Sequence, residues 1–168
     1  PDTMQCGDSA IFIAGDATGD RLLQHEAAGE GRNAGSNAAT FPKIKAMPHR
    51  TGLGIVFVDP QLGMCGKSFG ELTAEGIDFG IGEIGLGRQG RLRVSGRAQG
   101  HIRIYGERGT GKLLGAEIFG PDAEHLAHLL AWAMEAGVDV HQALAMPFYH
   151  PVVEEALRTA LSLLKKDL

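Results

Sequence analysis

The stretch FYHPVVEE, residues 148–155, places a histidine and two glutamates close together. A histidine side chain titrates near neutral pH, so His150 could take up or release a proton during a reaction. Proline is favoured at the first position of a helix, and the apolar periodicity that follows Pro151 predicts a helix over residues 151–164. We therefore expect His150 to lie at the N-terminal cap of this helix.

A carboxylate beside His150 would adjust its chemistry. The positive end of a helix dipole disfavours a protonated imidazole, whereas a nearby carboxylate offsets this effect and can accept a hydrogen bond from the ring. Glu154 and Glu155 are both candidates, because spacing alone does not separate them. The residues by themselves also allow a plainer interpretation, in which a capping histidine is followed by two solvated glutamates that do no chemistry.

Three glycine-rich stretches resemble phosphate-binding loops but lack the required context. GIGEIG and GLGRQG, residues 80–85 and 85–90, fit GxGxxG, yet the segment that follows them, RLRV, is predicted to be a strand rather than a helix. GERGTGKL, residues 106–113, has Leu113 where a phosphate loop needs a serine or threonine for magnesium. We interpret all three as hairpin turns.

Residues of the types that bind metals are scattered. His125 and His128 stand three apart on a predicted helix, but no third ligand is obviously placed, so we interpret them as part of a solvated helix face and expect no metal site. Cys6 and Cys65 form no CxxC pair and indicate no disulfide framework. We therefore expect a reducing compartment, the cytoplasm.

Composition excludes several classes of partner. The net charge of −4 and the pI near 6.0 argue against a nucleic-acid partner. No apolar run approaches the ~18 residues that a membrane helix needs, so we expect no membrane association. With 168 residues and 43% hydrophobic content, the chain is long and apolar enough to form a globular core.

The chain changes character near residue 50. Residues 10–16 read as a buried strand, and the segment from Arg21 to just before Pro42 reads as a helix. Short β-rich segments separated by glycine then predict an antiparallel sheet, and three helical patterns close the chain. The expected fold is α+β, with helices packed on one side of the sheet. The predicted strands cover residues 53–59, part of 60–66, 77–85, 90–96, 100–107 and 112–120; the predicted helices cover 121–136, 138–145 and 151–164.

These segments together resemble a known family. HPVVEE is similar to the His-Pro-x-x-x-Glu motif near the C-terminus of the flavin-dependent pyridine nucleotide-disulfide oxidoreductases. VFVDPQLGMCG resembles the opening strand of that family's dimerisation domain, and LLGAEIFGPDAEHLAHLLAWAMEAGVDV resembles its sheet-to-helix passage. IFIAGD followed by RLLQHEAAGEGR resembles the end of its flavin-binding domain. The resemblance covers nearly the whole chain, in the family's order.

The resemblance divides the chain into three parts. Residues 1–41 would be a C-terminal remnant of the FAD-binding domain, consisting of a strand and a helix. Residues 42–51 would be a linker, and residues 52–168 the dimerisation domain. The family's first glycine fingerprint and its redox-active cysteine pair are not in this sequence. We therefore expect the C-terminal part of a longer enzyme, which alone would neither catalyse a reaction nor hold a cofactor.

The resemblance also implies roles for single residues. His150 would be the general acid/base that takes a proton from a dithiol substrate, so that a thiolate can attack the enzyme's disulfide. Glu155, five residues on as in the family, would orient it. The pair would serve the active site of the other subunit, which implies a homodimer. The cofactors of the parent protein would be FAD and NAD. Asp16 would accept hydrogen bonds from the ribityl chain of FAD, and four further residues would approach the flavin: Leu22, Leu23, Gln24 and His25.

Several branches of the family share this kind of motif. The best match is the branch that oxidises dihydrolipoyl groups, which implies a lipoyl-bearing multienzyme complex as a candidate partner. Glutathione reductases and soluble transhydrogenases are the alternative branches. A stand-alone dimerisation module without chemistry is the alternative of a different class. Val152 stands where the family often has threonine, and we expect this change to leave the chemistry intact.

Overall fold

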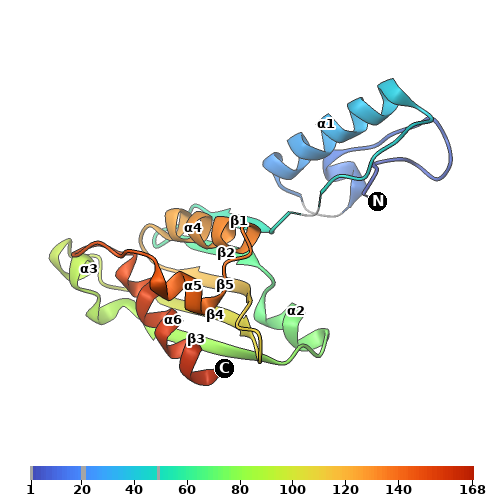
Figure 1. The fold of residues 1–168 in the computed structure, drawn as a ribbon. Coiled ribbons are helices and arrows are strands. Elements are labelled where there is room, and N and C mark those ends of the chain that lie inside the picture. The colour runs from blue at the N-terminus through green and yellow to red at the C-terminus, as the bar shows by residue number, and fades with distance from the viewer. Residues whose placement is uncertain (1, 20–21, 49) are drawn as a thin grey trace. The chain divides into compact units, whose positions relative to one another are not determined.

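The computed structural model describes residues 2–19, 22–48 and 50–168 (Figure 1). They form two compact units, Pro1–Arg50 and Thr51–Leu168. The first unit carries a 3-10 turn, η1 (Gly15–Thr18), and one long helix, α1 (Gln24–Thr40). The helix was predicted from Arg21, which lies outside the described residues.

The strand predicted over residues 10–16 is not formed. Phe12 makes a single antiparallel bridge with Gln5, because no neighbouring described segment of this unit continues the ladder. Buried polar side chains hold the unit together instead. The carboxylate of Glu30 on α1 accepts a hydrogen bond from the Gly15 N–H at 2.6 Å, and the Asn37 amide donates to the Lys45 carbonyl at 2.8 Å.

The second unit is built on one antiparallel sheet. Its order is β1-β2-β5-β4-β3, and every neighbouring pair is antiparallel. Alternation along the strands separates two faces: in β4, Ile102 and Ile104 are fully buried, whereas Arg103 between them is exposed. The predicted α+β fold with an antiparallel sheet is confirmed. The strands are β1 (Leu53–Val56), β2 (Leu62–Gly66), β3 (Phe79–Gly85), β4 (His101–Glu107) and β5 (Leu113–Phe119).

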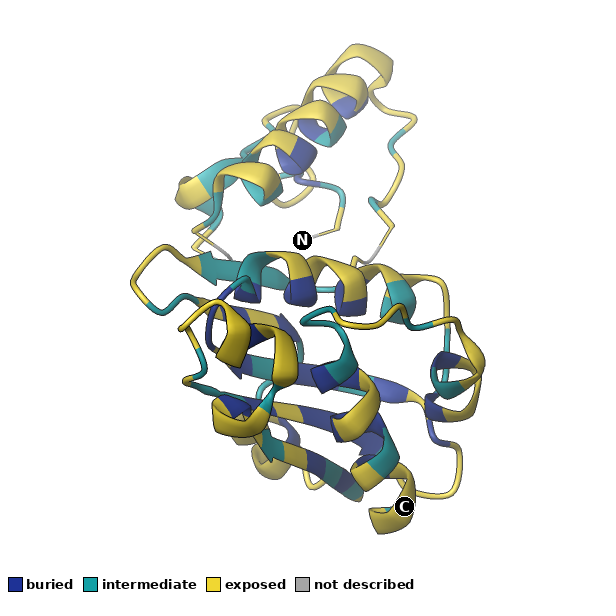
Figure 2. Ribbon diagram, turned by 90° about the vertical axis from the view of Figure 1, so that its left-hand side faces the viewer, coloured by how far each residue is buried: buried dark blue, intermediate teal, exposed yellow. Residues whose placement is uncertain are grey.

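Three helices cover the apolar face of this sheet. Helix α4 (Ala123–Glu135) packs on β2 and β5, α6 (Glu155–Asp167) packs on β3 and β4, and α5 (Val140–Ala145) packs on α6. Figure 2 shows the helices buried on their inner sides and exposed on their outer sides. The core therefore joins Ile102, Ile104 and Ile118 of the sheet to leucines of the helices, including Leu126, Leu157 and Leu161. No helix formed by the described residues is both long and apolar enough for a membrane span.

Residues 80–85, interpreted as a hairpin turn, lie within strand β3. Besides the strand at residues 10–16, two further predicted elements differ from those observed. Residues 90–96, predicted as a strand, begin with the short helix α3 (Gly90–Val94), in which Leu92 is buried and Val94 is 81% exposed. The Gln89 side chain accepts a hydrogen bond from the Leu92 N–H and so caps a helical turn there. The last helix begins at Glu155 rather than Pro151, so its N-cap is Glu154 and not His150 as expected, and residues 150–154 form turns. The remaining short elements are α2 (Phe69–Ala74) and η2 (Leu86–Arg88).

Candidate active site

His150 and Glu155 are in direct contact. His150 lies in the segment between α5 and α6, and its Nδ1 is 2.8 Å from Oε1 of Glu155, the first residue of α6. The other carboxylate oxygen of Glu155 accepts a hydrogen bond from the Val152 N–H at 3.2 Å. One carboxylate therefore binds both the imidazole ring and the turn that carries it.

The charge of Glu155 determines which ring nitrogen carries hydrogen. The hydrogen bond from His150 lowers the pKa of Glu155 below its ordinary value, and the Val152 N–H and the positive charges of His150 and Arg158 lower it further. An ionised carboxylate only accepts hydrogen bonds, so Nδ1 must be the donor. The lone pair of the neutral ring is then on Nε2, and the His150 side chain is 80% exposed. Such a ring can accept a proton from a group in solution.

The two glutamates that spacing could not separate point to different places. Glu155 lines a cavity of about 390 Å³ together with His150, whereas Glu154 lines a separate, mostly apolar cavity. The structure thus brings Glu155, and not Glu154, to His150. The first cavity is closed by η2 and α3 on one side and α6 on the other, and its lining is Ile84, Gly85, Arg88, Gln89, Gly90, His150, Glu155, Ala156 and Thr159.

Arg88 and Gln89 are site residues that the sequence did not indicate. They fall in GLGRQG, which we interpreted only as a turn. Gln89 donates from Nε2 to the Val152 carbonyl at 2.6 Å, and so joins α3 to the turn beside His150. Glutamine is not a preferred helix cap, so its residue type did not indicate the cap of α3. Nothing in the sequence indicated its contact with Val152 either.

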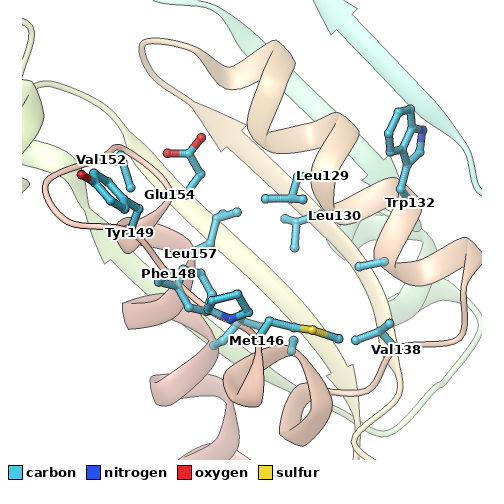
Figure 3. A pocket seen from close by; sticks show the side chains of 14 residues that line it. Leu129, Leu130, Trp132, Val138, Met146, Phe148, Tyr149, Val152, Glu154 and Leu157 are labelled. Atoms are coloured by element: carbon cyan, nitrogen blue, oxygen red, sulfur yellow. The ribbon is translucent and has the colours of Figure 1, made fainter.

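The second cavity lies along α4 and the segment after α5. Its volume is about 510 Å³, and Figure 3 shows apolar side chains from both elements around it, with Glu154 at its margin. Several are unusually exposed for their type: Trp132 is 73% exposed and Tyr149 79%. Apolar side chains that gather at a groove often mark an interaction site. Leu129 and Met146 extend the same surface, which we call the α4 groove.

The residues predicted to bind cofactor lie in the first unit. Asp16 is exposed on η1, which packs against α1. The other four stand together at the start of α1: Leu22 is 64% exposed, Gln24 and His25 are exposed, and Leu23 is half-buried. The sequence-based hypothesis for these residues stays a prediction. Within the described part of the chain, no group of three His, Cys, Asp or Glu side chains could hold a metal ion.

The match that decides the family is in the second unit. A sequence model of the pyridine nucleotide-disulphide oxidoreductase dimerisation domain matches residues 53–161. The chain belongs to this family. Similar proteins include dihydrolipoyl dehydrogenase 3 of Haloarcula marismortui, which is 30% identical over 158 residues, or 94% of this chain and 33% of the relative. The mitochondrial dihydrolipoyl dehydrogenase of Rattus norvegicus is 28% identical over 89% of this chain and 29% of its own length.

Solved structures share the fold. The HOCl-induced flavoprotein disulfide reductase RclA from Escherichia coli superposes with a TM-score of 0.78, at 20% identity, over 91% of this chain and 35% of that chain. LpdA from Mycobacterium tuberculosis gives a TM-score of 0.77, at 23% identity, over 90% and 33%. The chain therefore spans about a third of the length of the curated relatives it matches.

Proposed function

We propose that this chain supplies the acid/base pair, His150 and Glu155, of a flavin-dependent dithiol oxidoreductase of the dihydrolipoyl dehydrogenase type. The hydrogen bond between His150 Nδ1 and the Glu155 carboxylate is the observation that carries the proposal. Because the relatives are about three times as long, we propose that the chain acts as part of a longer protein. Alone it would bring neither a redox-active cysteine pair nor a complete cofactor site.

The two side chains have separate tasks in this proposal. A dithiol must lose a proton before its sulfur can attack a disulfide. His150 Nε2 accepts that proton, and the resulting imidazolium is stabilised by the negative charge of Glu155. When the substrate leaves as a disulfide, its two sulfurs have given two electrons to the redox-active disulfide of the parent protein and have lost two protons, one of them to solvent by way of His150. Glu155 also keeps the ring oriented throughout, because Nδ1 stays bonded to its carboxylate.

The residues at η1 and the start of α1 fit one edge of an FAD site. The exposed carboxylate of Asp16 can accept hydrogen bonds from the hydroxyl groups of a ribityl chain. The exposed Leu22 and the adjoining Leu23, Gln24 and His25 offer contact surface for the flavin. FAD, when bound, would carry electrons from the thiols to NAD. We propose these contacts as part of a site that the rest of the parent protein completes.

The α4 groove is the surface that we propose for a second copy of this chain. The family match already makes this a dimerisation domain. The groove joins α4 to the segment that carries His150, so a partner seated there would bring each His150 close to the other subunit. Burial of Trp132 and Tyr149, the most exposed side chains of the groove, would contribute most of the stabilisation. A lipoyl-bearing multienzyme complex is a further proposed partner.

An assay of dihydrolipoamide-dependent NAD reduction tests the proposed reaction, using the flavoprotein that contains this chain. We expect H150Q to lower turnover by roughly 10²–10⁴-fold, the usual contribution of a general base. H125Q is the matched control, because His125 is also highly exposed but lines neither cavity. Full activity of H150Q would contradict the acid/base role. A wild-type protein that dimerises but oxidises no dithiol would instead support a dimerisation module without chemistry.

A further inference from the structure

Gln89, which precedes α3, joins that helix to the turn that carries His150. The side-chain amide of Gln89 uses both of its ends: Oε1 accepts from the Leu92 N–H at 2.7 Å, and Nε2 donates to the Val152 carbonyl at 2.6 Å. The orientation of the amide follows from its partners, because an N–H can only donate and a carbonyl can only accept. Gln89 is half-buried, and Leu92 is 1% exposed, so one end of this connection is part of the core.

The connection continues from Val152 to the imidazole. The Val152 carbonyl is held by Gln89, and its N–H donates to one oxygen of Glu155 at 3.2 Å. The other oxygen of Glu155 is bonded to His150 Nδ1. The Val152 backbone is thus fixed on both sides, and the Glu155 carboxylate is oriented by the same backbone that it binds. Apart from its bond to Glu155, the highly exposed ring of His150 has no other hydrogen bond within the described residues.

We propose that Gln89 is a positioning residue for His150, acting through Val152 and Glu155. The inference rests on the proposed acid/base function for its biological meaning, but its geometry is independent of that function. Without the Gln89 donor, the turn of residues 150–154 would lose its side-chain hydrogen bond to α3, and the Val152 N–H would no longer hold the Glu155 carboxylate in place. His150 would then spend less time bonded to Glu155 through Nδ1.

The tautomer of neutral His150 measures this role directly. While Nδ1 donates to Glu155, the neutral ring carries its hydrogen on Nδ1; a ring released into water is free to carry it on Nε2. We would record the ¹⁵N shifts of both ring nitrogens in the 168-residue chain, at a pH where His150 is neutral. We expect Q89M, which removes both hydrogen bonds, to lower the ratio of the Nδ1–H to the Nε2–H tautomer by about twofold to tenfold, as loss of one hydrogen bond would.

Two further variants separate positioning from capping. Q89E keeps an oxygen that can accept from the Leu92 N–H but loses the donor to the Val152 carbonyl, so a positioning role predicts that it behaves as Q89M does. Q142M is the matched control: Gln142 accepts from the Asp139 N–H in the capping box of α5, and its loss leaves the turn beside His150 untouched. Q142M should keep the wild-type tautomer ratio.

The proposal is wrong if Q89M keeps the wild-type tautomer ratio, or if Q89E does so while Q89M does not. The second result would assign Gln89 to capping of α3 alone. Thermal unfolding of each variant identifies any that fail to fold, and Q89E serves if Q89M is one of these. The result is distinct from that of the activity assay, because a fully active H150Q enzyme would leave the tautomer measurement unchanged.

Discussion

At the scale of single residues, the stability that Glu155 contributes should depend on its charge. The hydrogen bond from His150 lowers its pKa in the folded chain, below the value of about 4.3 expected when unfolded. A lowered folded-state pKa stabilises the fold above the unfolded-state pKa, and this contribution is lost as the pH falls through the folded value. We expect E155Q to lower the free energy of unfolding near pH 7, and its difference from wild type to shrink below about pH 4.

Urea unfolding of both proteins across this pH range measures the difference. The glutamine introduced by E155Q would still offer an oxygen to the His150 ring, so the comparison isolates the charge. E154Q is the control, because the Glu154 side chain makes no hydrogen bond or ion pair within the described residues. A difference between wild type and E155Q that stays constant down to about pH 3 would contradict the linkage.

The two cysteines should react very differently with thiol reagents. Burial raises the pKa of Cys65 to about 12, and the side chain is only 2% exposed between β1 and β5. The thiolate is the reactive form, so Cys65 should stay unmodified in the folded chain. Cys6 is exposed. We expect a disulfide reagent at about pH 8 to modify Cys6 alone, and both cysteines after unfolding. C6S should then show no rapid reaction, and a fast reaction in folded C6S would refute the prediction.

At the scale of elements, the close packing of α6 on the sheet depends on a glycine in β3 that has no side chain. A Cβ atom at Gly82 of β3 would collide with the Ala160 carbonyl and lie 2.7 Å from the Cβ of Leu164. Both contacts involve the helix itself, so the helix would have to move. We expect G82A to lower the free energy of unfolding by about 1–3 kcal/mol, as overpacked cores do. G85A is the control, since Gly85 of the same strand has open space and an extended backbone; equal losses would contradict the packing argument. Chemical denaturation measures both.

The spacing of apolar residues predicted those strands and helices that pack against a continuous layer of the fold. The strands of the sheet and helices α4 and α6 follow apolar periodicity, because each buries one face against a continuous layer. Pattern failed at residues 90–96, where Leu92 and Val94 alternate with arginines as in a strand, although only Leu92 is buried. It also failed at residues 10–16, whose ladder partners are absent from the described part of this unit. In the first case a side-chain cap formed a helical turn, and in the second a strand lacked neighbours with which to pair within the described residues.

The candidate site could be predicted only in part, because the sequence does not show which tertiary contacts its residues make. The family motif already favoured Glu155 as the partner of His150. Spacing alone left Glu154 open, and the shared carboxylate became visible only in the three-dimensional turn, where Val152 and His150 both bind Glu155. Gln89 is 61 positions from His150, in the GxGxxG-like stretch of residues 85–90, which does not indicate a contact with the turn that carries His150. Contacts between side chain and backbone across such a distance leave no trace in residue type.

At the scale of the whole molecule, the α4 groove should decide the oligomeric state. Exposed apolar side chains gathered at one groove often mark an interaction site, and isologous pairing would bury them on both copies at once. Trp132 extends from the outer side of α4 and is 73% exposed, so W132E should fold normally while placing a charge in the contact.

We expect W132E to weaken dimerisation of the 168-residue chain by at least about tenfold, the effect of losing a moderate hot spot. Analytical ultracentrifugation over a dilution series measures the dissociation constant. V94E is the matched control, because Val94 is 81% exposed on α3 and lines neither cavity, so it should dimerise as wild type does. If W132E leaves dimerisation unchanged and V94E weakens it, the interface lies on the α3 side of the unit. In that case the proposed contribution of His150 to a partner subunit would be made from the cavity that it shares with Arg88 and Gln89, rather than beside the α4 groove.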